Sequence, residues 1–248
     1  MLLTLDIGNT NIKSALFLGN QLMNFIVHPD INEAVEYINK TIFKKAAICS
    51  VNPDLQKILS DKISSKGASI FQTNIQQKFN LTIKYETPST LGMDRVCSSV
   101  GALEIATNEK LISENQSIIT IDLGTATTIN IVSPDRQFIG GLIAPGVHTM
   151  LNSLNQNTAQ LPLTNQKSYY GLIGNSTNSS IISGVITATI GMINETVGHL
   201  IEESNQSPPV IFVTGGNSKN ILPLLKYKAF FDEALVLKGL KKIYDLNN

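Results

Sequence analysis

The sequence contains one short pattern twice, as Thr4-Leu5-Asp6-Ile7-Gly8-Asn9-Thr10 and as Thr120-Ile121-Asp122-Leu123-Gly124-Thr125-Ala126. In each copy an apolar, β-prone run ends in an aspartate, and the glycine that follows allows a tight turn and a close approach of the backbone to a ligand. A small hydroxyl or amide side chain comes next and can donate to a phosphate oxygen. Two matching turns therefore predict a duplicated fold that binds a nucleotide.

The residues after each turn predict a second strand rather than a helix. Apolar side chains resume over residues 12–17 in the first copy and over residues 129–132 in the second. Each copy is thus expected to form a β-hairpin. This excludes the usual P-loop geometry, in which the glycine-rich loop opens a helix.

Length and composition favour a large core and two domains. The chain has 248 residues, of which 42% are hydrophobic, so it can form one large domain or two of ordinary size. The duplicated motif favours two. The polar stretch over residues 107–116 is the best boundary, and it predicts an N-terminal domain of residues 1–115 and a C-terminal domain of residues 116–248.

Charge and cysteine content exclude several kinds of partner. Lys and Arg total 19 and Asp and Glu total 19, with no basic window, so nucleic acid is not an expected partner. Asp6 and Asn9 interrupt the start of the chain, and no run of 18 apolar residues follows, so we expect no membrane association and a cytoplasmic location. Cys49 and Cys97 lack metal-ligand spacing and are interpreted as small core residues in a reducing compartment.

Strand and helix patterns alternate along the chain, which predicts an α/β class. Residues 46–51 form a buried-strand pattern that Asn52 and Pro53 stop. A later helix carries apolar side chains at Val96, Val100 and further turns, so Asp94 and Arg95 lie at its start. The remaining expected elements are helices over 31–38 and 54–65, strands over 69–71, 81–83, 117–121, 127–133, 138–143 and 210–213, a turn or loop at Ala144-Pro145-Gly146, a helix and loop over 152–166, and a long helix over 186–197.

Asp6 and Asp122 end equivalent strands. In a pseudo-twofold fold they would face each other across a cleft that holds Mg²⁺ and a triphosphate, because hard cations prefer oxygen ligands. Lys13, on the second strand of the first hairpin, would neutralise phosphate charge. The alternatives are that each aspartate only starts a turn and that Lys13 is a solvated surface lysine.

A second dense cluster is Tyr85-Glu86-Thr87-Pro88-Ser89-Thr90-Leu91-Gly92-Met93-Asp94-Arg95. It predicts a small-anion site, in which Arg95 binds a substrate carboxylate through two hydrogen bonds and Asp94 orients a hydroxyl or accepts its proton. The alternative makes Asp94 a helix cap and Arg95 its ion-pair partner. The three histidines show no metal-ligand spacing, and the role of His148 stays open.

The duplicated turns, the cluster over residues 85–95 and the segment from Gly140-Gly141 to Pro145-Gly146 resemble the bacterial type III pantothenate kinases in order and spacing, over nearly the whole chain. That family belongs to the acetate kinase, sugar kinase, Hsp70 and actin superfamily. The resemblance implies two ribonuclease H-like domains around a nucleotide cleft. It also implies the transfer of a phosphoryl group from Mg-ATP to the primary hydroxyl of pantothenate, the first step of coenzyme A biosynthesis, with potassium or ammonium as a monovalent cation.

The resemblance also implies roles for individual residues. Asp94 would be the general base, Asp122 would hold the monovalent cation, and Arg95 would bind the carboxylate of pantothenate. The counterpart of Thr177 in this family reaches across a dimer interface, which implies a homodimer with the active site at the interface. The implied ATP-binding residues are Asp6, Ile7, Gly8, Asn9, Thr10, Asn11, Ile12, Lys13 and Thr125, and the implied pantothenate-binding residues are Tyr85, Gly92, Met93, Asp94, Arg95 and Thr177.

Two other functions compete with this one. The first is another small-molecule phosphotransferase of the same superfamily, because repeated phosphate loops specify a nucleotide better than they specify an acceptor. The cluster over residues 85–95 argues against it. The second is a nucleotide-binding regulatory protein that has lost catalysis. The presence of Asp6, Asp94, Arg95 and Asp122 argues against that loss.

Overall fold

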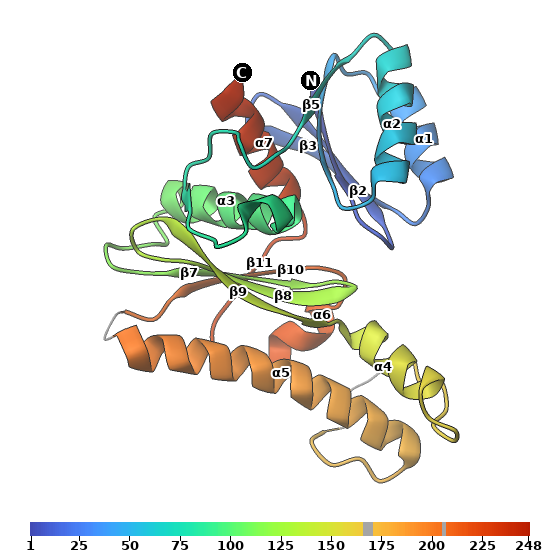
Figure 1. Cartoon of the computed structure of the whole chain (residues 1–248), viewed down its shortest axis with the longest axis vertical. Coiled ribbons are helices and arrows are strands. Elements are labelled where there is room, and N and C mark those ends of the chain that lie inside the picture. The colour runs from blue at the N-terminus through green and yellow to red at the C-terminus, as the bar shows by residue number, and fades with distance from the viewer. Residues whose placement is uncertain (166–170, 205–206) are drawn as a thin grey trace. The chain divides into compact units, whose positions relative to one another are not determined.

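A computed structural model describes residues 1–165, 171–204 and 207–248. The chain forms two compact units, each with a β-sheet and helices (Figure 1). The first unit contains residues 1–112, 135–139 and 234–248, and the second contains residues 113–134 and 140–233. The division into ribonuclease H-like domains at residues 115 and 116 stays a prediction. Gln166, the last residue of the expected segment over 152–166, lies outside the described residues.

The sheet of the first unit is built around β1 (Leu2–Ile7). β1 pairs with β2 (Ile12–Leu18) in antiparallel register and with β4 (Lys45–Ser50) in parallel register. β3 (Gln21–His28) and β5 (Ser69–Gln72) complete the order β3-β2-β1-β4-β5. The predicted hairpin of the first turn is therefore confirmed.

The second sheet repeats this plan around β7 (Ile118–Leu123). β7 pairs antiparallel with β8 (Ala126–Val132) and parallel with β10 (Val210–Thr214). The order is β11-β10-β7-β8-β9-β6, with β9 at Gln137–Pro145, β11 at Phe230–Phe231 and β6 at Thr82–Ile83. Five strands of this sheet thus match the first sheet in order about the central strand, which confirms the duplication.

Helices of the first unit begin where the sequence supplies caps. α1 (Ile31–Lys40) is capped by Asp30, whose carboxylate accepts hydrogen bonds from two backbone N–H groups of the first turn. α2 (Pro53–Ser65) is capped by Asn52 and has proline at its first position, which costs no helical hydrogen bond. Both helices pack on the apolar face that contains Leu3 and Leu5.

The closest helix packing of the first unit joins α3 (Met93–Asn108) to α7 (Leu235–Asn247). A Cβ atom at Gly239 would lie 1.8 Å from the carbonyl oxygen of Cys97, and one at Gly101 would lie 2.4 Å from that of Leu235. The two backbones are therefore in direct contact. Only glycine fits at these two positions without separating the helices.

The second unit packs its sheet on α5 (Thr177–Ser204). Ile186, Ile193 and Val197 of α5 share one apolar core with Ile119 and Ile121 of β7. Among the described helices, α5 is long and apolar enough to cross a membrane, but 44% of its apolar window is buried inside the unit. We interpret α5 as a core helix.

Shorter helical segments are α4 (Val147–Gln156), α6 (Ser218–Ile221) and the 3-10 turns η1 (Pro88–Thr90) and η2 (Leu222–Leu224).

The predicted turn at Ala144-Pro145-Gly146 is wrong for its first two residues. β9 continues through Pro145, and Gly146 is the N-cap of α4. A proline at the last residue of a strand removes one donor only, so the strand tolerates it. The same shift places the start of α4 at Val147, ahead of the helix expected from residue 152.

His28 makes the stability of the first unit depend on pH. Its side chain is 2% exposed, its Nε2 lies 2.7 Å from the Ser14 hydroxyl, and burial lowers its pKa. Unfolded histidine takes up a proton near pH 6.5, at roughly the ordinary value. Below that pH the unfolded chain holds more protons than the folded chain, so the free energy of unfolding falls as pH falls. We expect urea unfolding between pH 8 and pH 5.5 to show this loss.

The variant His28→Gln should lose that part of the pH dependence. His199 is exposed on α5, so His199→Gln is the matched control and should keep the parent's slope. Equal slopes for the parent and His28→Gln would contradict the assignment.

Candidate active site

The first turn has buried residues where it meets its two strands and exposed residues at its tip. Ile7 and Ile12 are 0% and 2% exposed and anchor the ends of the two strands, while Asn9, Thr10 and Asn11 are exposed. The turn closes through a hydrogen bond of 3.2 Å from the Gly8 N–H to the Asn11 carbonyl. The tip therefore offers backbone and side-chain donors to solvent or to a ligand.

Asp6 and Lys13 lie beside this turn as register partners on β1 and β2. The Asp6 Oδ2 and the Lys13 Nζ are 4.0 Å apart, and the two side chains are 14% and 19% exposed. A carboxylate suits a magnesium ion and its water shell, and an ammonium suits phosphate oxygen. The pair has the chemistry that a metal-nucleotide complex requires.

Asp94 lies in the first turn of α3, and Gly92 is the N-cap. The Oδ1 of Asp94 accepts a hydrogen bond of 2.9 Å from the Arg95 N–H. A Cβ at Gly92 would lie 2.5 Å from that oxygen, so the glycine leaves room for the carboxylate. Asp94 thus accepts a hydrogen bond at the start of its own helix, in line with the alternative of a structural role. The N-cap itself is Gly92 and not Asp94.

Two buried thiols join the strand beside Asp6 to the helix that carries Asp94. Cys49 is the register partner of Asp6 on β4, and Cys97 follows Asp94 by one helical turn on α3. A hydrogen bond with Cys97, then burial, then the charges of neighbouring groups including Asp6 and Asp94, raise the pKa of the Cys49 thiol well above its usual value. Both carboxylates therefore lie close enough to Cys49 to contribute to its raised pKa. The sequence had no signal for this contact, because the two cysteines are far apart along the chain.

Arg95 is buried against two aromatic rings. Its side chain is 6% exposed, and its Cζ lies 5.8 Å from the ring centroid of Tyr85 and 5.6 Å from that of Phe138. The hydroxyls of Ser98 and Ser99 each donate to the Arg95 carbonyl at 2.9 Å. The structure thus brings together Tyr85, Gly92, Asp94 and Arg95 as predicted, and it adds Phe138, which the sequence reasoning missed.

The second turn is fixed from two sides. The Thr125 carbonyl accepts from the Gly146 N–H at 2.9 Å and from the Thr149 hydroxyl at 2.6 Å. The Leu123 carbonyl accepts from the N–H and the side-chain amide of Asn217, at 3.0 and 3.3 Å. These hydrogen bonds fix the backbone of the second turn. The Thr125 side chain is exposed.

The Asp122 carboxylate lies against Gly215 at the end of β7. Gly215 has a φ of +98°, and a Cβ there would lie 2.5 Å from the Asp122 Oδ1. Thr214 is the register partner of Asp122, and its buried hydroxyl has no hydrogen-bond partner; the same holds for the hydroxyls of Thr127 and Ser218. A carboxylate and an adjacent unsatisfied hydroxyl fit a hard cation. In the described part of the chain, no group of three or more His, Cys, Asp or Glu residues is placed to hold a metal.

Thr177 is the first residue of α5 and is exposed. Before it, the Ser176 N–H donates to the Ser179 hydroxyl at 2.9 Å, and the Ser179 N–H donates to the Ser176 hydroxyl at 3.2 Å. This reciprocal pair fixes the helix start. Thr177 belongs to the second unit, and its place beside the pantothenate residues stays a prediction.

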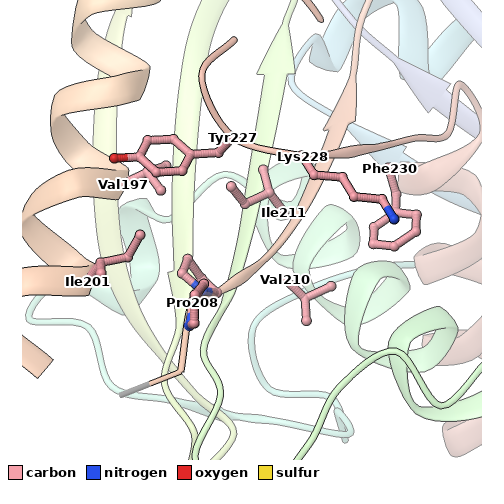
Figure 2. Close-up of a pocket in the computed structure, with 9 residues that line it drawn as sticks. Val197, Ile201, Pro208, Val210, Ile211, Tyr227, Lys228 and Phe230 are labelled. Carbon is pink, nitrogen blue, oxygen red and sulfur yellow. The ribbon is translucent and has the colours of Figure 1, made fainter. Parts of the chain in front are cut away.

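An apolar hollow of about 200 Å³ lies elsewhere in the second unit. Figure 2 shows that its side chains come from α5, from the start of β10 and the prolines before it, and from β11 and the segment before it. Asp122 pairs with Thr214, at the opposite end of β10, so the hollow is separate from the second turn. Its lining is Val197, Ile201, Pro208, Pro209, Val210, Ile211, Tyr227, Lys228 and Phe230.

The fold is similar to solved structures of low sequence identity. A protein from Campylobacter jejuni, described as a Baf family transcriptional activator, matches with a TM-score of 0.62 and 22% identity, over 98% of this chain and 97% of that chain. The activator of the 2-hydroxyisocaproyl-CoA dehydratase from Clostridium difficile, with bound ADPNP, matches with a TM-score of 0.53 and 11% identity, over 99% and 95%. Two sheets of one plan and these likenesses show a protein of the two-domain, ribonuclease H-like fold class.

Sequence comparison defines the family within this class. The model of the type III pantothenate kinase family matches residues 2–199. A type III pantothenate kinase from Finegoldia magna is 32% identical over 265 residues, covering 100% of this chain and 98% of the relative. The chain belongs to the type III pantothenate kinase family, which confirms the resemblance inferred from its motifs.

Proposed function

We propose that this chain transfers the γ-phosphoryl group of ATP to the primary hydroxyl of pantothenate, giving 4′-phosphopantothenate in the first step of coenzyme A biosynthesis. Membership of the family supports the reaction. The observation that carries the site assignment is geometric: Asp6 is the register partner of Cys49 on β4, and β4 packs against α3, which carries Asp94. It joins a phosphate-binding turn to a carboxylate that can accept a proton.

In this proposal residues 6–13 and Thr125 bind the ATP phosphates. The exposed tip of the first turn supplies N–H and hydroxyl donors, Lys13 supplies positive charge, and Asp6 would help to hold the magnesium ion. Magnesium bound with ATP neutralises charge on the transferred group, so the protein contributes mainly position and electrostatics.

Asp94 is the general base. A carboxylate is a weak base for an alcohol, so Asp94 aligns the hydroxyl and accepts its proton late, as the new oxygen–phosphorus bond forms and the bond to ADP breaks. Arg95 binds the pantothenate carboxylate through a two-pronged hydrogen bond. Tyr85, Gly92 and Met93 line the same substrate site.

Two further parts of the proposal concern the second unit. Asp122, beside the unsatisfied hydroxyl of Thr214, holds a potassium or ammonium ion. Thr177 reaches the pantothenate site of a second copy, so the active protein is a homodimer. We place the enzyme in the cytoplasm, with the reducing environment that its free thiols suit.

The test is ADP release by the purified protein with Mg-ATP and pantothenate in potassium, ammonium and sodium buffers. We expect pantothenate-dependent turnover in potassium or ammonium and little in sodium, because the proposal assigns a potassium or ammonium ion to Asp122. The variant Asp122→Asn should lose much of that activation while it keeps the fold.

Each failure identifies a different error. Equal turnover in all three buffers would contradict the assignment of a monovalent cation to Asp122. Absence of turnover from protein that still binds ATP would favour another acceptor or a regulatory role.

A further inference from the structure

Phe138 lies on β9, at a short parallel pairing with β6. Ile83 of β6 is the register partner of Phe138 on β9. The Thr82 N–H donates to the Arg136 carbonyl and the Lys84 N–H donates to the Phe138 carbonyl, both at 2.9 Å. The segment that leads to Tyr85 is therefore held along the start of β9 by backbone hydrogen bonds.

This pairing brings two rings to one guanidinium. The Tyr85 and Phe138 rings meet edge to face, with centroids 6.0 Å apart and planes at 65°. The Arg95 Cζ lies within 6 Å of both centroids, at 5.8 and 5.6 Å. Phe138 is 0% exposed, so its ring is shielded from solvent.

A buried guanidinium and two ring faces attract each other strongly. The negative face of an aromatic ring stabilises a cation within about 6 Å, and the effect grows when water is excluded. An aromatic ring has no lone pair that accepts a hydrogen bond. Contact with the rings therefore holds the guanidinium without requiring its N–H groups to donate to them. The two rings can therefore fix where the guanidinium lies without replacing a carboxylate ligand.

We propose that Phe138 is a positioning residue for acceptor binding: its ring, with that of Tyr85, holds the Arg95 guanidinium where it meets the carboxylate of the acceptor. The inference rests on the proposed function, in which Arg95 binds the carboxylate of pantothenate. Phe138 touches Arg95 and acts through it. It is therefore distinct from the predicted substrate-binding residues.

The test combines Phe138→Leu with fluorinated phenylalanines at position 138. Leucine keeps an apolar side chain and removes the ring face, so we expect the KM for pantothenate to rise about tenfold. We expect the kcat and the KM for ATP to stay within about twofold, because the lost contact affects acceptor binding alone. Stepwise fluorination keeps the ring's shape and weakens its negative face, so the KM should rise with each added fluorine.

Two controls separate positioning from a structural effect. Phe43 is also buried, at 7% exposed, and carries Lys66 Nζ 5.7 Å from its ring centroid, so Phe43→Leu removes a comparable contact in the same unit and should leave the KM unchanged. A pantothenate analogue with a primary alcohol in place of the carboxylate should be used equally well by the parent and by Phe138→Leu.

The outcomes distinguish this inference from the proposed function. A parent enzyme that neither binds nor phosphorylates pantothenate, by calorimetry and by ADP release, overturns both. An active parent whose KM is insensitive to fluorination, or a Phe138→Leu variant equally impaired with the alcohol analogue, overturns the inference alone.

Discussion

Replacement of Asp94 by asparagine is expected to lower the kcat for pantothenate phosphorylation by about a hundredfold or more. Asparagine has the same shape, and its amide oxygen can still accept the bond from the Arg95 N–H that closes the start of α3. An amide cannot take the proton of the substrate hydroxyl. The affinity for ATP, measured by calorimetry, should therefore stay within about twofold of the parent.

The matched variant is Asp6→Asn, which changes the other carboxylate beside Cys49. It should weaken the binding of magnesium and ATP, because Asp6 lies at the phosphate-binding turn. Normal turnover of Asp94→Asn would remove Asp94 from the role of base. Unchanged nucleotide affinity of Asp6→Asn would count against its part in metal binding.

The largest effect on stability is expected from Gly239→Ala. Its new methyl group would lie 1.8 Å from the carbonyl oxygen of Cys97, where the obstacle is backbone and cannot rotate away. α7 must move off α3, so the free energy of unfolding should fall by about 3 kcal/mol or more. Urea denaturation followed by circular dichroism measures the change.

The control is Gly184→Ala on α5, where a Cβ would meet nothing within 4 Å. Because alanine is the better helix former, this variant should be more stable than the parent by up to about 1 kcal/mol. An unfolding midpoint of Gly239→Ala close to that of the parent would contradict the close packing of α3 on α7.

Local patterns predicted the elements that carry the site. The apolar runs and the glycines of the two turns gave both hairpins, and the apolar spacing after Asp94 gave the start of α3. These features depend on neighbouring residues alone. The approximate position of Asp94, Arg95 and the two turns along their elements was therefore readable from the sequence.

Contacts between distant segments were not readable in the same way. Cys49 and Cys97 meet because β4 and α3 pack together, and no spacing rule links them. Phe138 lies on β9, which pairs with β6, a strand of two residues that is too short to give a periodic signal. The packing of α7 on α3 depends on two glycines whose role appears only when both backbones are placed.

The two buried thiols, Cys49 and Cys97, can be used to measure the opening of the first unit. Cys49 and Cys97 are 1% and 0% exposed, and the raised pKa of Cys49 keeps that thiol in its unreactive, protonated form. An alkylating reagent can reach them only when the packing around them opens. The rate of alkylation thus measures how often the first unit opens, without any engineered label.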